Sequence, residues 1–135
     1  MNIELSDKEF RRLLDLVYIG NWILNSIRTE DRFEDYDLLQ EKFFGICAKN
    51  GLHALVDTYM GKHYPSRAYE EGGIQEAIAD YEDTVFFHIL AEEMALRDMQ
   101  EENIASDNLN ELYSRTKEYM AEFDLNGIDT LRIEE

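Results

Sequence analysis

Apolar residues recur at helical spacing most densely between positions 74 and 102. On an α-helix, one face spanning about 80° of arc carries Ile74, Ile78, Tyr81, Val85, His88, Glu92, Leu96 and Met99. The two ionisable residues His88 and Glu92 therefore lie in the middle of the predicted buried stripe. The remaining faces are also largely apolar, through Phe86, Phe87, Leu90 and Met94. A helix of this kind needs neighbours on all sides or a second copy of the protein, so we predict one long central helix at about 74–102.

Local signals place further helices on both sides of this segment. Ser6 followed by Glu9 forms a capping box, and the apolar stripe after it continues to about Ile27 with Asn21 inside it. A second helical pattern covers 36–47 and ends at Asn50-Gly51. Residues 52–60 fit a third, shorter helix, with Leu52, Val56, Tyr59 and Met60 directed inward.

The last helix is predicted to begin at Ser106 or Asp107 and to end at Asn126-Gly127. Residues 124–135 alternate weakly between apolar and polar positions, which fits a short strand or a flexible tail, and no second strand is predicted as its partner. The length and the hydrophobic content of 44% suit one domain spanning 1–135. The predicted fold is all-α, a compact bundle of about five helices.

The segment 61–73 interrupts the helical pattern with the only proline and several glycines. We expect a loop, and Tyr64, Arg67 and Tyr69 are its candidate contacts for a small molecule bound beneath it. The alternative is a connector whose tyrosines pack against the bundle.

Two pairs of residues have the i,i+4 spacing that brings a histidine and a carboxylate together on one helix face. They are His88 with Glu92 and His53 with Asp57, and His63 supplies a third imidazole. These groups could bind a transition metal that lowers the pKa of a bound water in an enzyme. The alternative is a buried structural pair in which Glu92 or Asn21 satisfies His88. No Glu-x-x-His unit, phosphate-binding glycine loop, nucleophile elbow or Cys-x-x-Cys motif occurs, so we do not expect an enzyme or a required cofactor.

Charge narrows the classes of partner. The chain has 30 acidic and 13 basic residues, a formal net charge of −17, and between Ala68 and Ser114 a single basic residue, Arg97, faces thirteen acids. Such a protein repels nucleic acid and anionic lipid and attracts basic proteins. Cys47, at an apolar helical position, is predicted to be a buried thiol, and we expect a cytoplasmic location without a membrane span.

The function that these patterns favour is a protein–protein interaction or regulatory module with a basic partner. A metal-dependent enzyme and a small-molecule binding protein remain as alternatives. A homodimer is also predicted from the surplus apolar faces, which contain Ile19, Trp22 and Ile23 in the first helix and Phe86, Leu90 and Met94 in the long helix.

Overall fold

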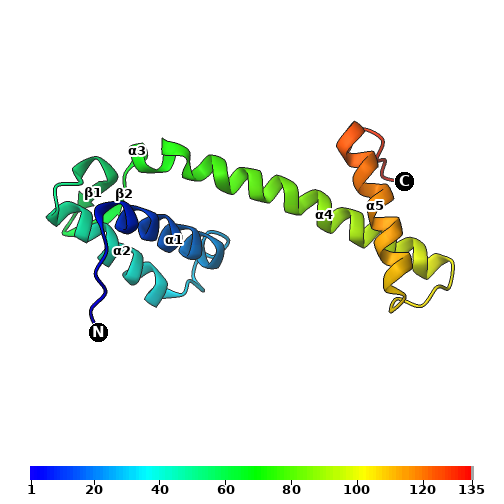
Figure 1. The fold of residues 1–135 in the computed structure, drawn as a ribbon, viewed down its shortest axis with the longest axis horizontal. Helices are drawn as coiled ribbons and strands as arrows, with labels where there is room; N and C mark the ends of the chain where they lie inside the picture. Colours follow the sequence, from blue (N-terminus) through cyan, green and yellow to red (C-terminus); the bar gives the residue numbers. More distant parts are fainter. Residues whose placement is uncertain (135) are drawn as a thin grey trace. The chain divides into compact units, whose positions relative to one another are not determined.

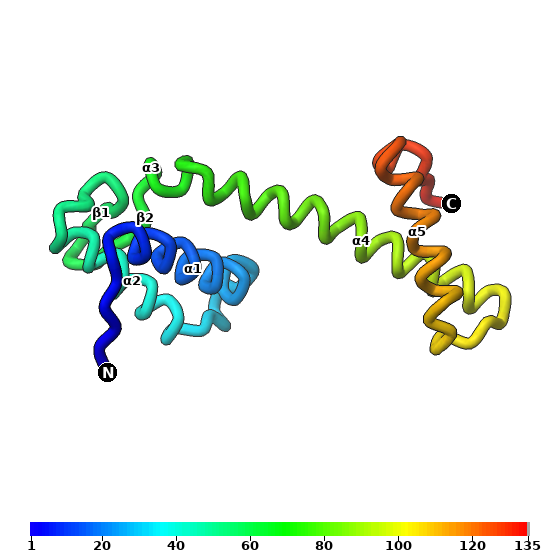
Figure 2. Tube along the Cα trace, in the orientation of Figure 1, coloured from blue at the N-terminus to red at the C-terminus, as the bar shows by residue number. Residues whose placement is uncertain are grey.

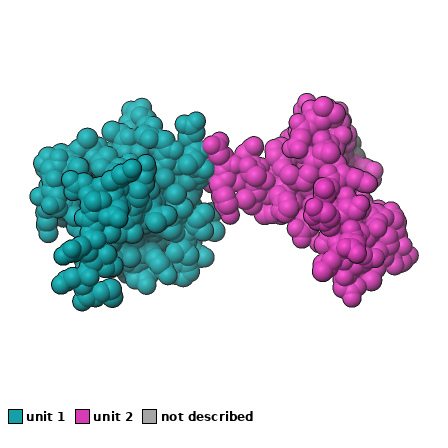
Figure 3. Space-filling model, viewed as in Figure 1, with its two compact units in different colours: residues 1–78 teal, residues 79–135 magenta. Residues whose placement is uncertain are grey.

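The computed structural model describes residues 1–134 and is predominantly α-helical, as the sequence predicts (Figure 1). The chain divides into two compact units, Met1–Ile78 and Ala79–Glu135 (Figure 3). The predicted long helix is present as α4, Gln75–Glu101, whose first turn belongs to the first unit and whose remainder belongs to the second.

The first unit begins with two helices whose ends follow the local signals. In α1, Asp7–Asn25, the Ser6 hydroxyl accepts a hydrogen bond from the Glu9 amide, and the Glu9 carboxylate accepts one from the Ser6 amide. Helix α2, Glu34–Lys49, stops where Gly51 adopts the left-handed conformation with φ +79°. The predicted capping box and glycine stop are both confirmed.

The third helix predicted at 52–60 is wrong. His53–Leu55 forms a single 3₁₀ turn, η1, and Val56–Tyr59 and Lys62–Pro65 then pair as the antiparallel strands β1 and β2. The two-residue turn has positive φ at Met60 and Gly61, as in the tight hairpins whose twist matches that of the strands. The i,i+4 spacing of 52–60 suits a helix, but its β-branched and aromatic residues find a strand partner in the segment that we assigned to a loop.

The segment 61–73 is therefore not an irregular loop. After β2, the short α3, Arg67–Tyr69, begins where the Ser66 hydroxyl accepts a hydrogen bond from the Tyr69 amide and donates one to the carbonyl of Ala54. The wide turn η2, Glu70–Ile74, follows. It is kinked at Gly73, whose φ of +113° favours glycine, and the chain then enters α4.

The core of the first unit lies between α1, α2, the hairpin and α3, with the start of α4 (Figure 2). Tyr69 is only 1% exposed, and its ring meets Phe44 and Tyr18 edge to face, with centroids 5.0 and 5.2 Å away. Cys47 is fully buried as predicted, and burial raises the pKa of its thiol. Ile78 brings α4 into this core.

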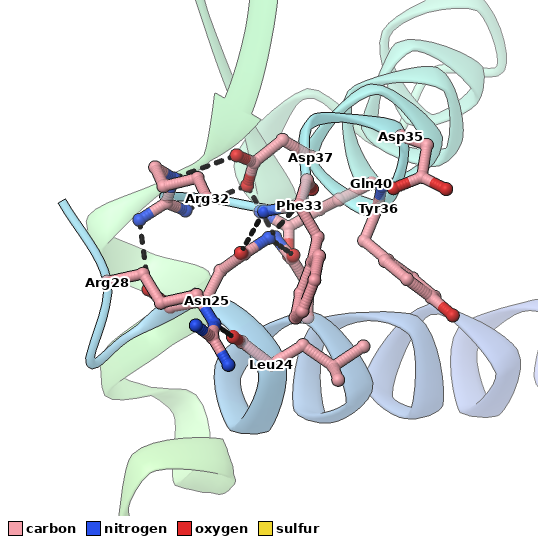
Figure 4. Close-up of polar contacts among 10 residues, drawn as sticks. Leu24, Asn25, Arg28, Arg32, Phe33, Asp35, Tyr36, Asp37 and Gln40 are labelled. Carbon is pink, nitrogen blue, oxygen red and sulfur yellow. Dashed lines mark hydrogen bonds and ion pairs between the residues drawn. The ribbon is translucent and has the colours of Figure 1, made fainter. Parts of the chain in front are cut away.

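A buried polar network joins α1 to the segment before α2 (Figure 4). The Asn25 side chain, 1% exposed, pairs with the backbone of Phe33 in both directions: its amide group donates to the Phe33 carbonyl at 3.1 Å, and its oxygen accepts from the Phe33 amide at 2.8 Å. Asn25 also donates to Asn21, and Asn21 donates to Asp37 and Gln40. Asn21 is thus satisfied within the first unit and is not the partner that we considered for His88.

The second unit pairs the rest of α4 with α5, Leu109–Asn126. The two helices contact each other through Phe87 of α4 and Phe123 of α5, whose ring centroids are 5.6 Å apart. Ala91 and Ala95 of α4 are fully buried. The α5 N-cap is Asn108, later than the predicted Ser106 or Asp107, because the Asn108 side chain accepts from the Glu111 amide. After Gly127, at φ +56°, residues 127–130 form a turn, and 131–134 contain no strand.

Candidate functional site: the outer face of α4

The pair predicted to be buried on α4 lies at the surface. The side chain of His88 is 61% exposed and that of Glu92 is 47% exposed, and the closest nitrogen and oxygen are 3.9 Å apart. This separation is too long for a hydrogen bond. The prediction of a buried pair is wrong because α5 covers a neighbouring side of α4, where Ala91, Ala95 and Met99 are fully buried.

The other candidate metal ligands lie in the first unit and do not converge. His53 is exposed in η1, and Asp57 and His63 lie on β1 and β2. His63 is opposite Thr58, whose hydroxyl is 3.0 Å from its Nδ1, whereas Asp57 is opposite Tyr64. Because neighbouring strand residues alternate between faces, Asp57 and His63 point to opposite sides of the hairpin. Within residues 1–134, no three His, Cys, Asp or Glu side chains gather as a metal site.

The three contacts proposed for the 61–73 segment are also separated. Tyr69 belongs to the core, where its hydroxyl donates to Asp15 at 2.8 Å, and burial is the main cause that raises the pKa of this phenol. Arg67 is exposed and pairs with Glu71 at 2.7 Å. Tyr64 lines a cavity of about 410 Å³ that His63 and Arg32 also border. The tyrosines therefore divide between the two alternatives: Tyr69 packs inside and Tyr64 stays at the surface.

The outer face of α4 exposes large apolar side chains, and α5 does the same at Leu109, Tyr113 and Leu125. Phe86 and Ile89 are 52% and 54% exposed, and Tyr81 is exposed as well. Spacings of four, three and four residues place Glu82, Phe86, Ile89 and Glu93 along one line of the helix. We call these four residues the outer α4 face. It combines apolar contact area with acidic side chains.

Polar contacts between α4 and α5 hold this face away from α5. Tyr119 donates a hydrogen bond to Asp98, and this bond, more than the neighbouring Arg97, lowers the pKa of the Asp98 carboxyl. Arg115 of α5 forms ion pairs with Glu102, the residue after α4, and with Glu111 on α5, each at 2.6 Å. Such pairs add little energy at the surface.

Negative charge is concentrated in the same unit. Residues 79–135 contain sixteen acidic and four basic residues, a formal net charge of −12, whereas residues 1–78 contribute −5. The sequence pattern identified Phe86 as a side chain in need of a cover but assigned Tyr81 to the buried stripe and did not select Ile89. The acidic residues Glu82 and Glu93, each in line with Phe86 and Ile89, were the available signal that this side of the helix is the solvent side.

Comparisons with protein-family models, with curated proteins and with solved structures find no match to this chain. Among the helices of residues 1–134, none combines the length and the apolar composition needed to cross a bilayer.

Proposed function

We propose that this protein is an interaction module whose outer α4 face binds a basic amphipathic helix of another protein. The observation that carries this proposal is the exposure of Phe86 and Ile89 in line with Glu82 and Glu93. An amphipathic helix can lay its apolar side on such a face while its lysines or arginines reach the flanking carboxylates. We place this interaction in the cytoplasm, in keeping with the single buried Cys47.

Electrostatics supports a basic partner over an acidic or neutral one. A unit with a net charge of −12 attracts cationic proteins over several ångströms and increases their association rate. The same charge opposes nucleic acid, so we expect no direct binding of DNA or RNA. Salt screens this attraction with a Debye length of about 8 Å at physiological ionic strength, so affinity should fall as salt rises.

A labelled 18-residue model helix of leucine and lysine is a defined probe for this surface, and its fluorescence anisotropy reports binding. We expect affinity to weaken between low and physiological salt, and the Phe86→Ser/Ile89→Ser variant to lose about tenfold or more. Leu125→Ser is the matched control, because Leu125 is exposed on α5 in the same unit and lies outside the outer α4 face.

Two outcomes would contradict the proposal. Equal binding of a probe with glutamine in place of lysine would exclude charge recognition. Equal loss in the Leu125→Ser control and in the α4 variant would show nonspecific attraction to an acidic protein rather than docking on the outer α4 face.

A further inference from the structure

Near its C-terminal end, helix α1 buries two asparagines and exposes large apolar side chains. Its buried side contains Leu14, Tyr18, Asn21 and Asn25. Its outer side exposes Leu16 and Ile23, which are 66% and 55% accessible, and Ile27 in the turn that follows the helix is 83% accessible. The asparagines inside are explained by the hydrogen bonds to Phe33, Asp37 and Gln40. No other part of residues 1–134 covers the exposed side chains of Leu16, Ile23 and Ile27.

The outer residues follow the spacing of a helix–helix seam. Leu16, Gly20 and Ile23 are separated by four and three residues, which is the a/d pattern of two packed helices, and Ile27, in the turn after α1, follows four residues later. We call these four residues the outer α1 seam. The seam belongs to the first unit and is separate in sequence from the outer α4 face.

Gly20 is the second observation. Glycine in a helix interior costs roughly 1 kcal/mol relative to alanine, and here a Cβ would meet no atom within 4 Å. The φ of Gly20 is not positive, so neither the backbone conformation nor crowding within the chain requires glycine. A glycine in the middle of an exposed apolar seam is what allows a second helix to approach closely.

The charge pattern selects the occupant of this seam. Residues 16–27 contain no Asp, Glu, Lys or Arg, and this is the longest uncharged run in a chain whose formal net charge is −17. Two copies that meet along this run avoid the repulsion that contact through the second unit, at −12 each, would bring. A basic partner, in contrast, would find no carboxylate within the run to pair with. From these observations we propose that the outer α1 seam is a self-association surface that packs α1 against α1 of a second copy around Gly20.

The seam is small. With the flanking half-buried Ile19, Trp22 and Leu24, two copies would bury a total on the order of 1,000 Å², at the low end of specific interfaces. We therefore expect a reversible dimer with a dissociation constant on the order of micromolar to tens of micromolar.

Sedimentation equilibrium of the full chain, up to about 200 μM, tests this proposal. We expect a concentration-dependent dimer in the wild type and in Ile89→Asp, and a monomer in Ile23→Asp. Ile23 and Ile89 are matched, because they are isoleucines of nearly equal exposure on different helices. Circular dichroism should show that both variants remain folded.

Gly20→Ala separates the interface from a merely structural role. Alanine favours the helix and meets no atom, so the melting temperature of the dilute monomer should rise by a few degrees. In the dimer, the added methyl group holds the helices apart, so the dissociation constant should increase several-fold.

The opposite results would overturn the proposal. They are a wild type that stays monomeric at every concentration, a dimer that is lost in Ile89→Asp and kept in Ile23→Asp, or a dimer that Gly20→Ala leaves unchanged. The first result would assign the seam to a different protein, and the second would assign the dimer to the outer α4 face. Because neither face contributes to the other, the first and third results leave the proposal for the outer α4 face intact.

Discussion

Replacing Asn25 with alanine tests the account of the network that joins α1 to the start of α2. The Asn25 amide makes three hydrogen bonds from a position that is 1% exposed: two with the backbone of Phe33 and one with Asn21. Alanine removes all three and leaves the amide and carbonyl of Phe33 without these partners. Arg32, which donates to the backbone carbonyl of Asn25, keeps that contact.

The expected loss follows from these contacts. Each hydrogen bond contributes about 0.5–1.5 kcal/mol net, and buried groups left unpaired add to the cost, so Asn25→Ala should lose about 2–4 kcal/mol of unfolding free energy. The first unit has 78 residues. For a unit of that size, 1 kcal/mol shifts the melting temperature by about 4–8 °C, so we expect a decrease on the order of 10–30 °C.

Thermal and urea unfolding, followed by circular dichroism, measure this loss. Ser26→Ala is the control, because Ser26 is the next residue and is exposed. Asn25→Asp is a second probe, since a carboxylate still accepts from the Phe33 amide but cannot donate to its carbonyl. If Asn25→Ala unfolds within a degree of Ser26→Ala, the network does not hold the segment before α2 as we describe.

Three further predictions concern the hairpin and α4. Met60→Asn should raise the free energy of unfolding by about 0.5–1 kcal/mol, because asparagine tolerates the positive φ of Met60 in the hairpin turn better than methionine does. A lower urea midpoint in the variant would contradict this. Asp98→Asn should lower the melting temperature near pH 7. A carboxyl whose pKa is lowered on folding contributes stability above its unfolded pKa, and this contribution is lost as pH falls through the folded pKa. The variant and the wild type should therefore converge at pH below the lowered pKa of Asp98, and a difference that persists there would refute the carboxylate contact with Tyr119. His88→Ala should change stability by less than about 0.5 kcal/mol because His88 is exposed, and urea unfolding that showed 2 kcal/mol or more would contradict the exposed position.

Local chemistry predicted the helix boundaries well, because the signals that end a helix act within a few residues. Ser6 and Glu9 satisfy each other's backbone wherever the helix packs, and Gly51 and Gly127 adopt conformations that other residues avoid. The hairpin could not be found in this way. A strand is stable only with a partner, and the residues opposite Val56–Tyr59 followed a Met-Gly turn instead of the Asn-Gly or Asp-Gly that signals a hairpin in sequence.

The candidate site was predicted less well than the fold. Apolar residues on every side of a helix indicate that other protein surfaces pack against it. The sequence pattern does not indicate which side the rest of the chain packs against. The periodicity from Ile78 to Met99 placed His88 and Glu92 on the buried side. In the structure, Ile78 is buried in the first unit and Met99 in the second, so the stripe does not form one continuous buried surface. Between its two ends, α4 changes neighbours, and His88 lies in the part that neither core covers.

Helix α1 shows why burial and hydrophobicity have to be considered separately. Asn21 and Asn25 are inside because the segment before α2 lacks its own secondary structure, and its backbone groups need side-chain partners. Because these two asparagines occupy the buried side of α1, Ile23 in the same part of the helix is exposed. Ile23 and Ile27 therefore remain exposed although the chain folds around the other side of the helix. An internal constraint explains the asparagines, but it explains neither the outer isoleucines nor the uncrowded Gly20, and a second helix against the seam accounts for both.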